Sequence, residues 1–262
     1  MEQVYLRLQI SIRVAKNIQQ AILPFQRELD YFFKEHFMVY LPKDVVSGDF
    51  YWVGEVTEQG TSKTFLAVVD CTGHGVPGAF MALIGHMLLE KIIYQLHITA
   101  PAQILEKLNE EVQRVLRQQE MHNDSGMDMV VLCLEKASEH ATQITFAGAK
   151  NPLLYLPANT SQMQILKGTR KSVGGKFQTD IVFESETIIL ASGSQIYMGS
   201  DGLSDQNNVK RRKFGQKRLI QVLEENQHHT LDVQKEAILD ALQTFKLNTD
   251  QRDDILWMGI KL

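Results

Sequence analysis

Four aspartates lie far apart in the sequence but share one local setting. Each stands at one end of an apolar run: Asp49, Asp70, Asp201 and Asp253. Such a run is typical of a buried strand, so each carboxylate is expected where a strand leaves the core and meets solvent. Carboxylates that meet at a sheet edge repel one another and are costly to desolvate, so a positive charge between them would stabilise the group. Hard divalent cations, which prefer oxygen ligands, are the natural candidates.

The segment VVDCTGHGVPGAF, which contains Asp70, predicts a strand that passes through a glycine-rich turn into a helix. Gly73, Gly75 and Gly78 allow positive φ and a close approach of the backbone to a ligand, and a helix N-terminus offers free N–H groups. Taken alone, the same segment is also explained as a tight strand-to-helix connection. The turn therefore strengthens the case for a site at Asp70 only in combination with the other aspartates.

The elements that must position these residues follow from hydrophobic periodicity. Helices are expected over 2–22, 77–96, 101–119, 216–226 and 230–245. Strands are expected over 36–41, 49–56, 64–70, 127–135, 142–148, 152–156, 180–184, 187–191, 195–201 and 254–262. Runs of strands interrupted by a helix pair favour an α+β fold with two mainly antiparallel sheets and helices outside them.

Residues 1–25 are expected to form a separate N-terminal helix, ended by Pro24, before a domain that spans 26–262. Apolar or small residues recur on it at alternating spacings of four and three: Val4, Leu8, Ser11, Ala15, Ile18 and Ile22. This stripe fits a helix that packs on its own domain, and it fits equally a signalling or dimerisation helix. A homodimer through this helix is thus one expectation.

Bulk composition excludes several classes. With 27 basic and 31 acidic residues the net charge is −4, which provides no global field for nucleic acid or an anionic membrane. No apolar run reaches the ~18 residues of a spanning helix, so we expect no membrane insertion. Cys71 and Cys133 lack the spacing of a disulfide framework or a zinc site, which suits a reducing cytoplasm. We therefore expect a soluble cytoplasmic domain, either on its own or as the output domain of a larger, membrane-bound sensor.

Six segments occur in a characteristic order: SGDFYW, DCTGHGVPGAF, SGMDM, FAGAKNPLLY, SDG and a terminal RDD. Together they resemble the metal-dependent serine/threonine protein phosphatases (the PPM or type 2C superfamily), and within it the bacterial SpoIIE/RsbU-like branch, over roughly residues 36–262. The resemblance implies a four-layer α-β-β-α sandwich with a two-metal site at one end of the sheets. That fold agrees with the pattern of strand runs and helix pairs.

The resemblance also implies a role for each site residue, all of them catalytic through two Mn²⁺ or Mg²⁺ ions. Asp70 would bridge the two ions, the main-chain carbonyl of Cys71 would join one, and Asp49 would serve that ion directly or through water. Asp201 and Asp253 would complete the shell of the other ion. The adjacent Asp254 would be a neighbour rather than a ligand, and Ile255 and Leu256 depart from the hydroxyl-containing ending that is frequent in the family.

The expected reaction is hydrolysis of phosphoserine or phosphothreonine by a metal-activated water, since two ions can supply the nucleophile and neutralise the phosphoryl oxygens. By resemblance the substrate would be a bacterial regulator, such as an anti-sigma-factor antagonist of the STAS type, in partner-switching signalling. The alternative is a catalytically silent module of the same fold that sequesters a partner. A two-metal nuclease is disfavoured by the near-neutral charge and the absence of a base-stacking pattern.

For several other residues and segments, the sequence allows two interpretations. His74 is either a general acid or part of a structural turn, and Lys43 either reaches the phosphate or is solvated. The basic run 210–218 is either a solvated loop or a docking surface for an acidic phosphoprotein. In the related branch, the helices corresponding to 77–96 and 101–119 shift to complete the metal site, which makes a similar movement a hypothesis here.

Overall fold

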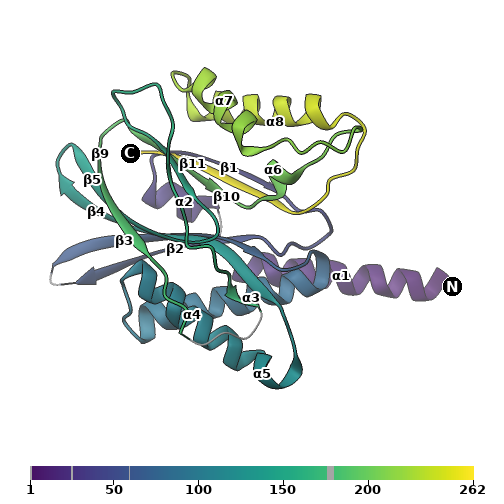
Figure 1. Ribbon diagram of the computed structural model, residues 1–262. Coiled ribbons are helices and arrows are strands. Elements are labelled where there is room, and N and C mark those ends of the chain that lie inside the picture. The colour runs from purple at the N-terminus through teal and green to yellow at the C-terminus, as the bar shows by residue number, and fades with distance from the viewer. Residues whose placement is uncertain (1, 25, 59, 176–179) are drawn as a thin grey trace.

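The computed structural model describes residues 2–24, 26–58, 60–175 and 180–262. Two antiparallel sheets pack face to face, and helices cover both outer faces (Figure 1). The first sheet has the order β1 (Glu35–Leu41), β11 (Ile255–Lys261), β10 (Gln195–Gly199), β6 (Leu153–Leu156) and β7 (Gln164–Leu166). The second has the order β2 (Phe50–Glu58), β3 (Thr61–Cys71), β4 (Gly126–Ser138), β5 (Ala141–Ala149) and β9 (Ser185–Ala191), with β8 (Val173–Gly174) paired to β4.

The helices form the outer layers. On the second sheet lie α3 (Gly75–Glu90), the π-helical turn η1 (Lys91–Gln95), α4 (Pro101–Val115) and α5 (Gln118–Met121). On the first sheet lie α7 (Gln216–Asn226) and α8 (Leu231–Lys246), with the short α6 (Gly202–Asp205) after β10. The order of layers confirms the expected α-β-β-α sandwich. The chain begins with α1 (Glu2–Ile22) and α2 (Gln26–Phe32).

Strand alternation explains how the layers hold together. In β2, Phe50 and Trp52 point into a core under α3 and α4, whereas Tyr51 and Val53 point into the core between the sheets. Successive residues of a strand face opposite sides, so an almost fully apolar strand can serve two cores at once. A third core, around Tyr197, lies between the first sheet and α7 and α8. Apolar runs without alternation thus mark the strands that are covered on both faces.

One predicted strand is wrong: residues 180–184 form no ladder, and β9 begins only at Ser185. Phe183 is buried in the core under α4, and its N–H donates to Glu106 Oε1 at 3.2 Å. The apolar pattern of this segment therefore reflects packing against a helix. The short strands β7 and β8 were not predicted because three residues or fewer carry no measurable period.

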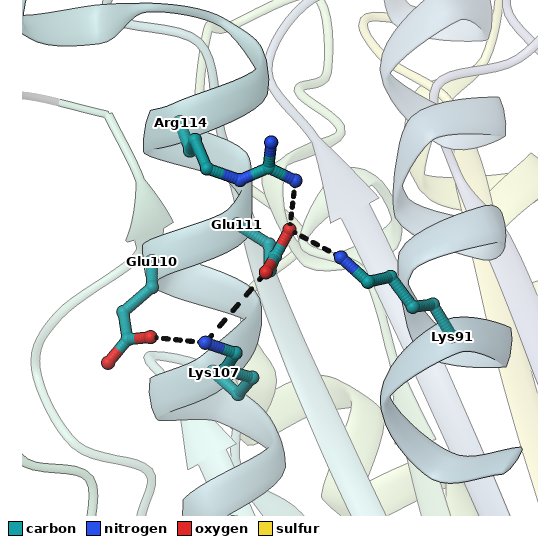
Figure 2. Close-up of polar contacts among 5 residues, drawn as sticks. All are labelled: Lys91, Lys107, Glu110, Glu111 and Arg114. Carbon is teal, nitrogen blue, oxygen red and sulfur yellow. Dashed lines mark hydrogen bonds and ion pairs between the residues drawn. The ribbon is translucent and has the colours of Figure 1, made fainter. Parts of the chain in front are cut away.

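The helix expected over 77–96 is present as α3 followed by η1, and η1 is tied to α4 by an ionic cluster (Figure 2). At its centre is Glu111, whose side chain is only 8% exposed. It contacts Lys91 Nζ at 3.0 Å, Arg114 Nη2 at 2.5 Å and Lys107 Nζ at 3.8 Å. Lys107 also pairs with Glu110 at 2.7 Å. A nearly buried carboxylate is costly without its cations, so separating Lys91 from Glu111 would be unfavourable and the cluster joins the two helices.

Among the described residues, one helical stretch, Gly75–Gln95, has the length and composition that could cross a membrane, and half of its most apolar window is buried. Its buried residues, among them Leu89 and Ile92, belong to the core under α3 and α4. The apolar character of this helix is accounted for by that packing, and such a helix is weak evidence for a membrane.

The helix α1 confirms the expectation for 2–22, and its first turns project away from the sheets (Figure 1). Val4, Ile10, Val14 and Ile18 are each at least half exposed. By contrast, Gln19 is 5% exposed and is paired with the main chain of Ser47: its Nε2 donates to the Ser47 carbonyl at 2.7 Å, and its Oε1 accepts from the Ser47 N–H at 3.1 Å. The end of α1 is therefore fixed to the loop that precedes Asp49.

Candidate functional site

The ends of four strands bring the aspartates together at one end of the sandwich. Asp49 directly precedes β2, Asp70 is the penultimate residue of β3, and Asp201 follows β10. Asp253 and Asp254 precede β11. In both antiparallel sheets these ends meet on the same side, and each acid lies near enough to others of the group to raise their pKa values. The residues come from both sheets, so the site lies across the two central layers.

Asp49 is almost fully buried, with 2% exposure. Its Oδ2 atom is buried and has no hydrogen-bond partner among the described residues. Burial, followed by the charge of Asp70, raises the pKa of Asp49 well above its usual range, while the hydroxyl of Ser200 lowers it to a smaller degree. An ionised carboxylate in this position needs a cation, since an unpartnered buried oxygen costs several kcal/mol.

Asp70 and Asp201 are in direct contact. The N–H of Asp201 donates to Asp70 Oδ2 at 3.3 Å. Burial, then the charge of Asp201, raises the pKa of Asp70 to about 8, with smaller contributions from Asp128 and Asp253. Burial also raises the pKa of Asp201, and Asp205 and Asp253 add to that rise. The protein therefore concentrates negative charge where it is poorly solvated.

The two adjacent acids before β11 have different settings. Asp254 is 2% exposed, and its two oxygens accept from the N–H groups of Lys43 and Gly48, each at 2.7 Å. Asp253 is exposed, and its Oδ1 accepts only from the Asp254 N–H, at 2.9 Å. Asp254 is thus occupied in holding the loop before Asp49, which leaves Asp253 as the acid that faces the cluster.

Two close backbone approaches keep the Asp49 loop on the turn that follows β3. A Cβ added at Gly48 would lie 2.5 Å from the Gly73 carbonyl oxygen and 3.3 Å from that of Cys71. A Cβ at Gly78 would lie 2.2 Å from the Gly73 oxygen. Only glycine allows these contacts. They place the Cys71 carbonyl beside the residue before Asp49, while the Cys71 thiol is buried in the core, where burial raises its pKa well above the usual range.

Asp128 was missed by the sequence reasoning. It lies in β4 directly opposite Asp70, is half-buried, and raises the pKa values of Asp70 and Asp201. Lys150 Nζ contacts its Oδ2 at 3.1 Å, and Ser172 donates to its Oδ1 at 2.6 Å. The sequence signal was the polar residue between Met127 and Met129 in SGMDM, because a carboxylate inside an apolar strand needs partners.

The Nδ1 atom of His74 pairs with Asp44 Oδ2 at 2.6 Å rather than with an acid of the cluster. Both side chains are about half exposed. The pair joins the turn after β3 to the loop before β2, which agrees with the structural reading of the GHG turn.

The model of the family described as "Stage II sporulation protein E (SpoIIE)" matches residues 60–262. The chain belongs to the SpoIIE family. Comparison with curated proteins gave no match.

Solved structures agree with membership of the SpoIIE family. The SiaA-PP2C domain of Pseudomonas aeruginosa is 30% identical, with a TM-score of 0.86 and 100% of each chain covered. The RsbU and RsbW domains of a Mycobacterium tuberculosis protein give 18% identity and a TM-score of 0.65, covering 87% of this chain and 59% of that one. The PP2C domain of SpoIIE from Bacillus subtilis, with a fragment of its regulatory domain, is 16% identical, with a TM-score of 0.64. The match covers 87% of this chain and 63% of that one. The latter two show the fold alone.

The donor set of this SpoIIE-family domain has features for and against a fit to divalent ions. In favour are the unpartnered Oδ2 of Asp49 and the mutual repulsion of Asp49, Asp70 and Asp201. Against it, no group of three or more His, Cys, Asp or Glu side chains among the described residues is arranged to hold an ion directly. Magnesium-type sites commonly use one or two carboxylates with several waters, so the oxygen-only donor set fits Mg²⁺ or Mn²⁺ better than zinc.

Proposed function

We propose that this SpoIIE-family domain hydrolyses phosphoserine or phosphothreonine on a protein, with the help of two Mn²⁺ or Mg²⁺ ions. The observation that supports it most is the buried and unpartnered Oδ2 of Asp49 next to Asp70. Two such ions would lower the pKa of a bound water and neutralise charge on the phosphoryl oxygens. The aspartates would bind and orient the two ions, because carboxylates that repel one another in the metal-free protein are stabilised most by a cation between them.

Each acid has a proposed position in this arrangement. Asp70, which contacts the Asp201 N–H and lies near Asp49, would be shared between the two ions. Asp49 and the carbonyl of Cys71 would serve one ion, and Asp201 and Asp253 the other. Asp254 keeps the Asp49 loop in place through its two backbone hydrogen bonds. The Cys71 thiol is buried and takes no part.

The test is release of phosphate from a phosphoserine and a phosphothreonine peptide with and without manganese, beside a dinucleotide. We expect manganese-dependent hydrolysis of the peptides and none of the dinucleotide. No three-residue ligand set is directly arranged among the described residues, which favours a second candidate, a catalytically silent module that binds a partner. Titration calorimetry with manganese decides between them: a silent module would bind little metal and release no phosphate.

The cellular role is proposed on the same basis. The substrate would be a bacterial regulatory protein, of which a STAS-type antagonist in a partner-switching pathway is the example we favour, and the domain would act in the cytoplasm. Apart from the basic run, no patch in the described residues suggests nucleic acid. Incubating the domain with a phosphorylated STAS protein and following its dephosphorylation by mass spectrometry tests this assignment; an unchanged phosphoprotein, with an active domain, contradicts it.

Self-association through α1 is also proposed. The stripe residues Val4, Ile18 and Ile22 are 72%, 51% and 38% exposed, so the domain leaves much of this apolar stripe uncovered. We expect a dimer by light scattering at high concentration and a monomer for Ile18→Glu, because a charge in a helix-pair seam is costly. Equal masses for the two proteins, in either state, would contradict the proposal.

A further inference from the structure

A hollow of about 560 Å³ opens directly beside Asp253. Three segments that are distant in the sequence form its wall: the loop after β1, the loop after α6 and the turn before β11. Each contributes one cation, namely Lys43, Arg211 and Arg252. Asp250 is the one carboxylate among the residues that line it. The hollow therefore carries a net positive charge next to the most acidic part of the molecule.

Two residues that line the hollow are directly connected to the acids of the site. Arg252 immediately precedes Asp253, so their Cα atoms are about 3.8 Å apart. The Lys43 N–H is bound to Asp254. A peptide with its phosphorylated residue at the acids would therefore extend across this hollow within one or two residues.

The three cations have no acid partner of their own. Among the described residues, no ion pair involves Lys43, Arg211 or Arg252; within the same basic run, Lys213 does pair with Asp205, at 2.5 Å. Most basic runs are solvated loops in which long side chains move freely. Unpaired cations gathered from three separate segments around one hollow are a different case, because their mutual repulsion is relieved by an acidic ligand.

The wall of the hollow is held together by hydrogen bonds from one buried side chain. Gln206, which is fully buried, donates from Nε2 to the carbonyl oxygens of Asn207 and Asp250, each at 3.0 Å, and accepts the Arg252 N–H on Oε1 at 3.0 Å. One side chain thus joins the basic loop to the turn that carries Asp253. A binding surface that is already ordered loses less entropy when a partner binds.

The basic surface continues on the other side of the same loop. A second hollow, of about 660 Å³, shares Asn208 and Val209 with the first and is lined by Lys210, Arg212 and Arg218. The guanidinium of Arg218 lies 4.3 Å from the centre of the Phe245 ring, which holds it in place. The cationic surface is therefore longer than one phosphate group and suits a chain segment.

We propose that this basic surface docks an acidic segment of the protein substrate, next to its phosphorylated residue. The inference rests on the proposed phosphatase function and adds the chemical class of the substrate surface. Charge complementarity argues for this occupant, since the rest of the chain has a net negative charge and the lining of this hollow gathers unpaired cations from three segments. The phosphate itself stays with the acid cluster and its ions.

The experiment compares three phosphoserine peptides with the same core and with acidic, neutral or basic flanks, in manganese. We expect the wild-type protein to have a kcat/KM about tenfold higher for the acidic peptide than for the neutral one, mainly through KM. That ratio should fall towards one at 0.5 M salt, where the Debye length is about 4 Å. Arg211→Asp should abolish or invert the preference; aspartate tolerates the positive φ of 56° at this position.

The matched control is Lys136→Glu, which changes net charge by the same two units. Lys136 is exposed near the far end of β4 from Asp128, about 26 Å along the strand. We expect it to keep the wild-type preference. Equal kcat/KM values of the wild-type protein for acidic and neutral peptides, or the same loss in Lys136→Glu as in Arg211→Asp, would overturn the docking proposal while leaving the phosphatase proposal intact. If none of the three peptides were hydrolysed, the phosphatase proposal would be overturned, and the docking proposal with it.

Discussion

Asp70→Asn is expected to abolish metal-dependent phosphate release, by about 10³-fold or more, and at the same time to stabilise the metal-free protein. The activity falls because the residue proposed to be shared by both ions loses its charge. The stability rises because the asparagine removes a carboxylate that is repelled by Asp201 and Asp128 in a poorly solvated place. Phosphate release and thermal unfolding in a chelator measure the two effects.

The pH dependence gives the sign of the second effect. The pKa of Asp70 is raised to about 8 in the folded protein, from about 4 in an unfolded chain. A group with a raised pKa stabilises the fold fully below the unfolded value and loses that contribution as the pH rises through the folded value. In a chelator, Asp70→Asn should therefore exceed the wild-type protein in Tm by several degrees at pH 8 and by little at pH 4.5.

Two observations separate this expectation from a general effect of charge. Adding manganese should raise the Tm of the wild-type protein and leave that of Asp70→Asn nearly unchanged. Asp232→Asn, in the first turn of α8, is the control; it should lower stability slightly, because a carboxylate there is favourable to the helix dipole. A metal-free Asp70→Asn protein less stable than the wild type at pH 8 would contradict the proposed crowding of charge.

Asp254→Ala is expected to lower the free energy of unfolding by about 2 to 5 kcal/mol, because two backbone N–H groups lose their acceptor in a buried place. Those groups belong to Lys43 and Gly48, which lie in the loop that carries Asp49. Asp254→Asn keeps one acceptor and should cost less. Chemical denaturation monitored by tryptophan fluorescence measures the difference.

The neighbouring Asp253→Ala is the matched comparison, since the same side chain is removed one residue away. Asp253 is exposed and has a single short-range hydrogen bond, so its removal should change stability by less than about 1 kcal/mol and weaken manganese binding instead. If Asp253→Ala proved the more destabilised and Asp254→Ala bound manganese more weakly with unchanged stability, the assignment of the two acids would be reversed.

The strands that carry the acids were predictable for a physical reason. Strands covered on both faces read as continuous apolar runs, so their ends are visible in the sequence, and antiparallel pairing brings those ends together. Asp49, Asp70, Asp201 and Asp253 could be placed at one edge on that basis. Asp128 could not, because it lies inside its strand and is tolerated only through Lys150 and Ser172.

Other features depend on contacts between distant segments and have no periodic signal. The buried amide of Gln206 and the buried carboxylate of Asp254 are satisfied by backbone groups 40 or more residues away. The segment 180–184 has the composition of a strand but packs Phe183 under α4. The apolar composition of a segment indicates that it is buried, but it does not indicate whether a strand or a helix covers it, because that depends on the tertiary structure.

The pairing of Gln19 with Ser47 links the position of α1 to the order of the Asp49 loop. Displacing α1 would leave the Ser47 N–H and carbonyl without partners, at a cost of about 1 to 3 kcal/mol for each group. A helix of 21 residues is about 30 Å long, so a displacement of its first turns is transmitted to this contact over most of that length. Because such couplings are reciprocal, a ligand that orders the Asp49 loop also favours the docked helix, and tension on the helix opposes binding of that ligand.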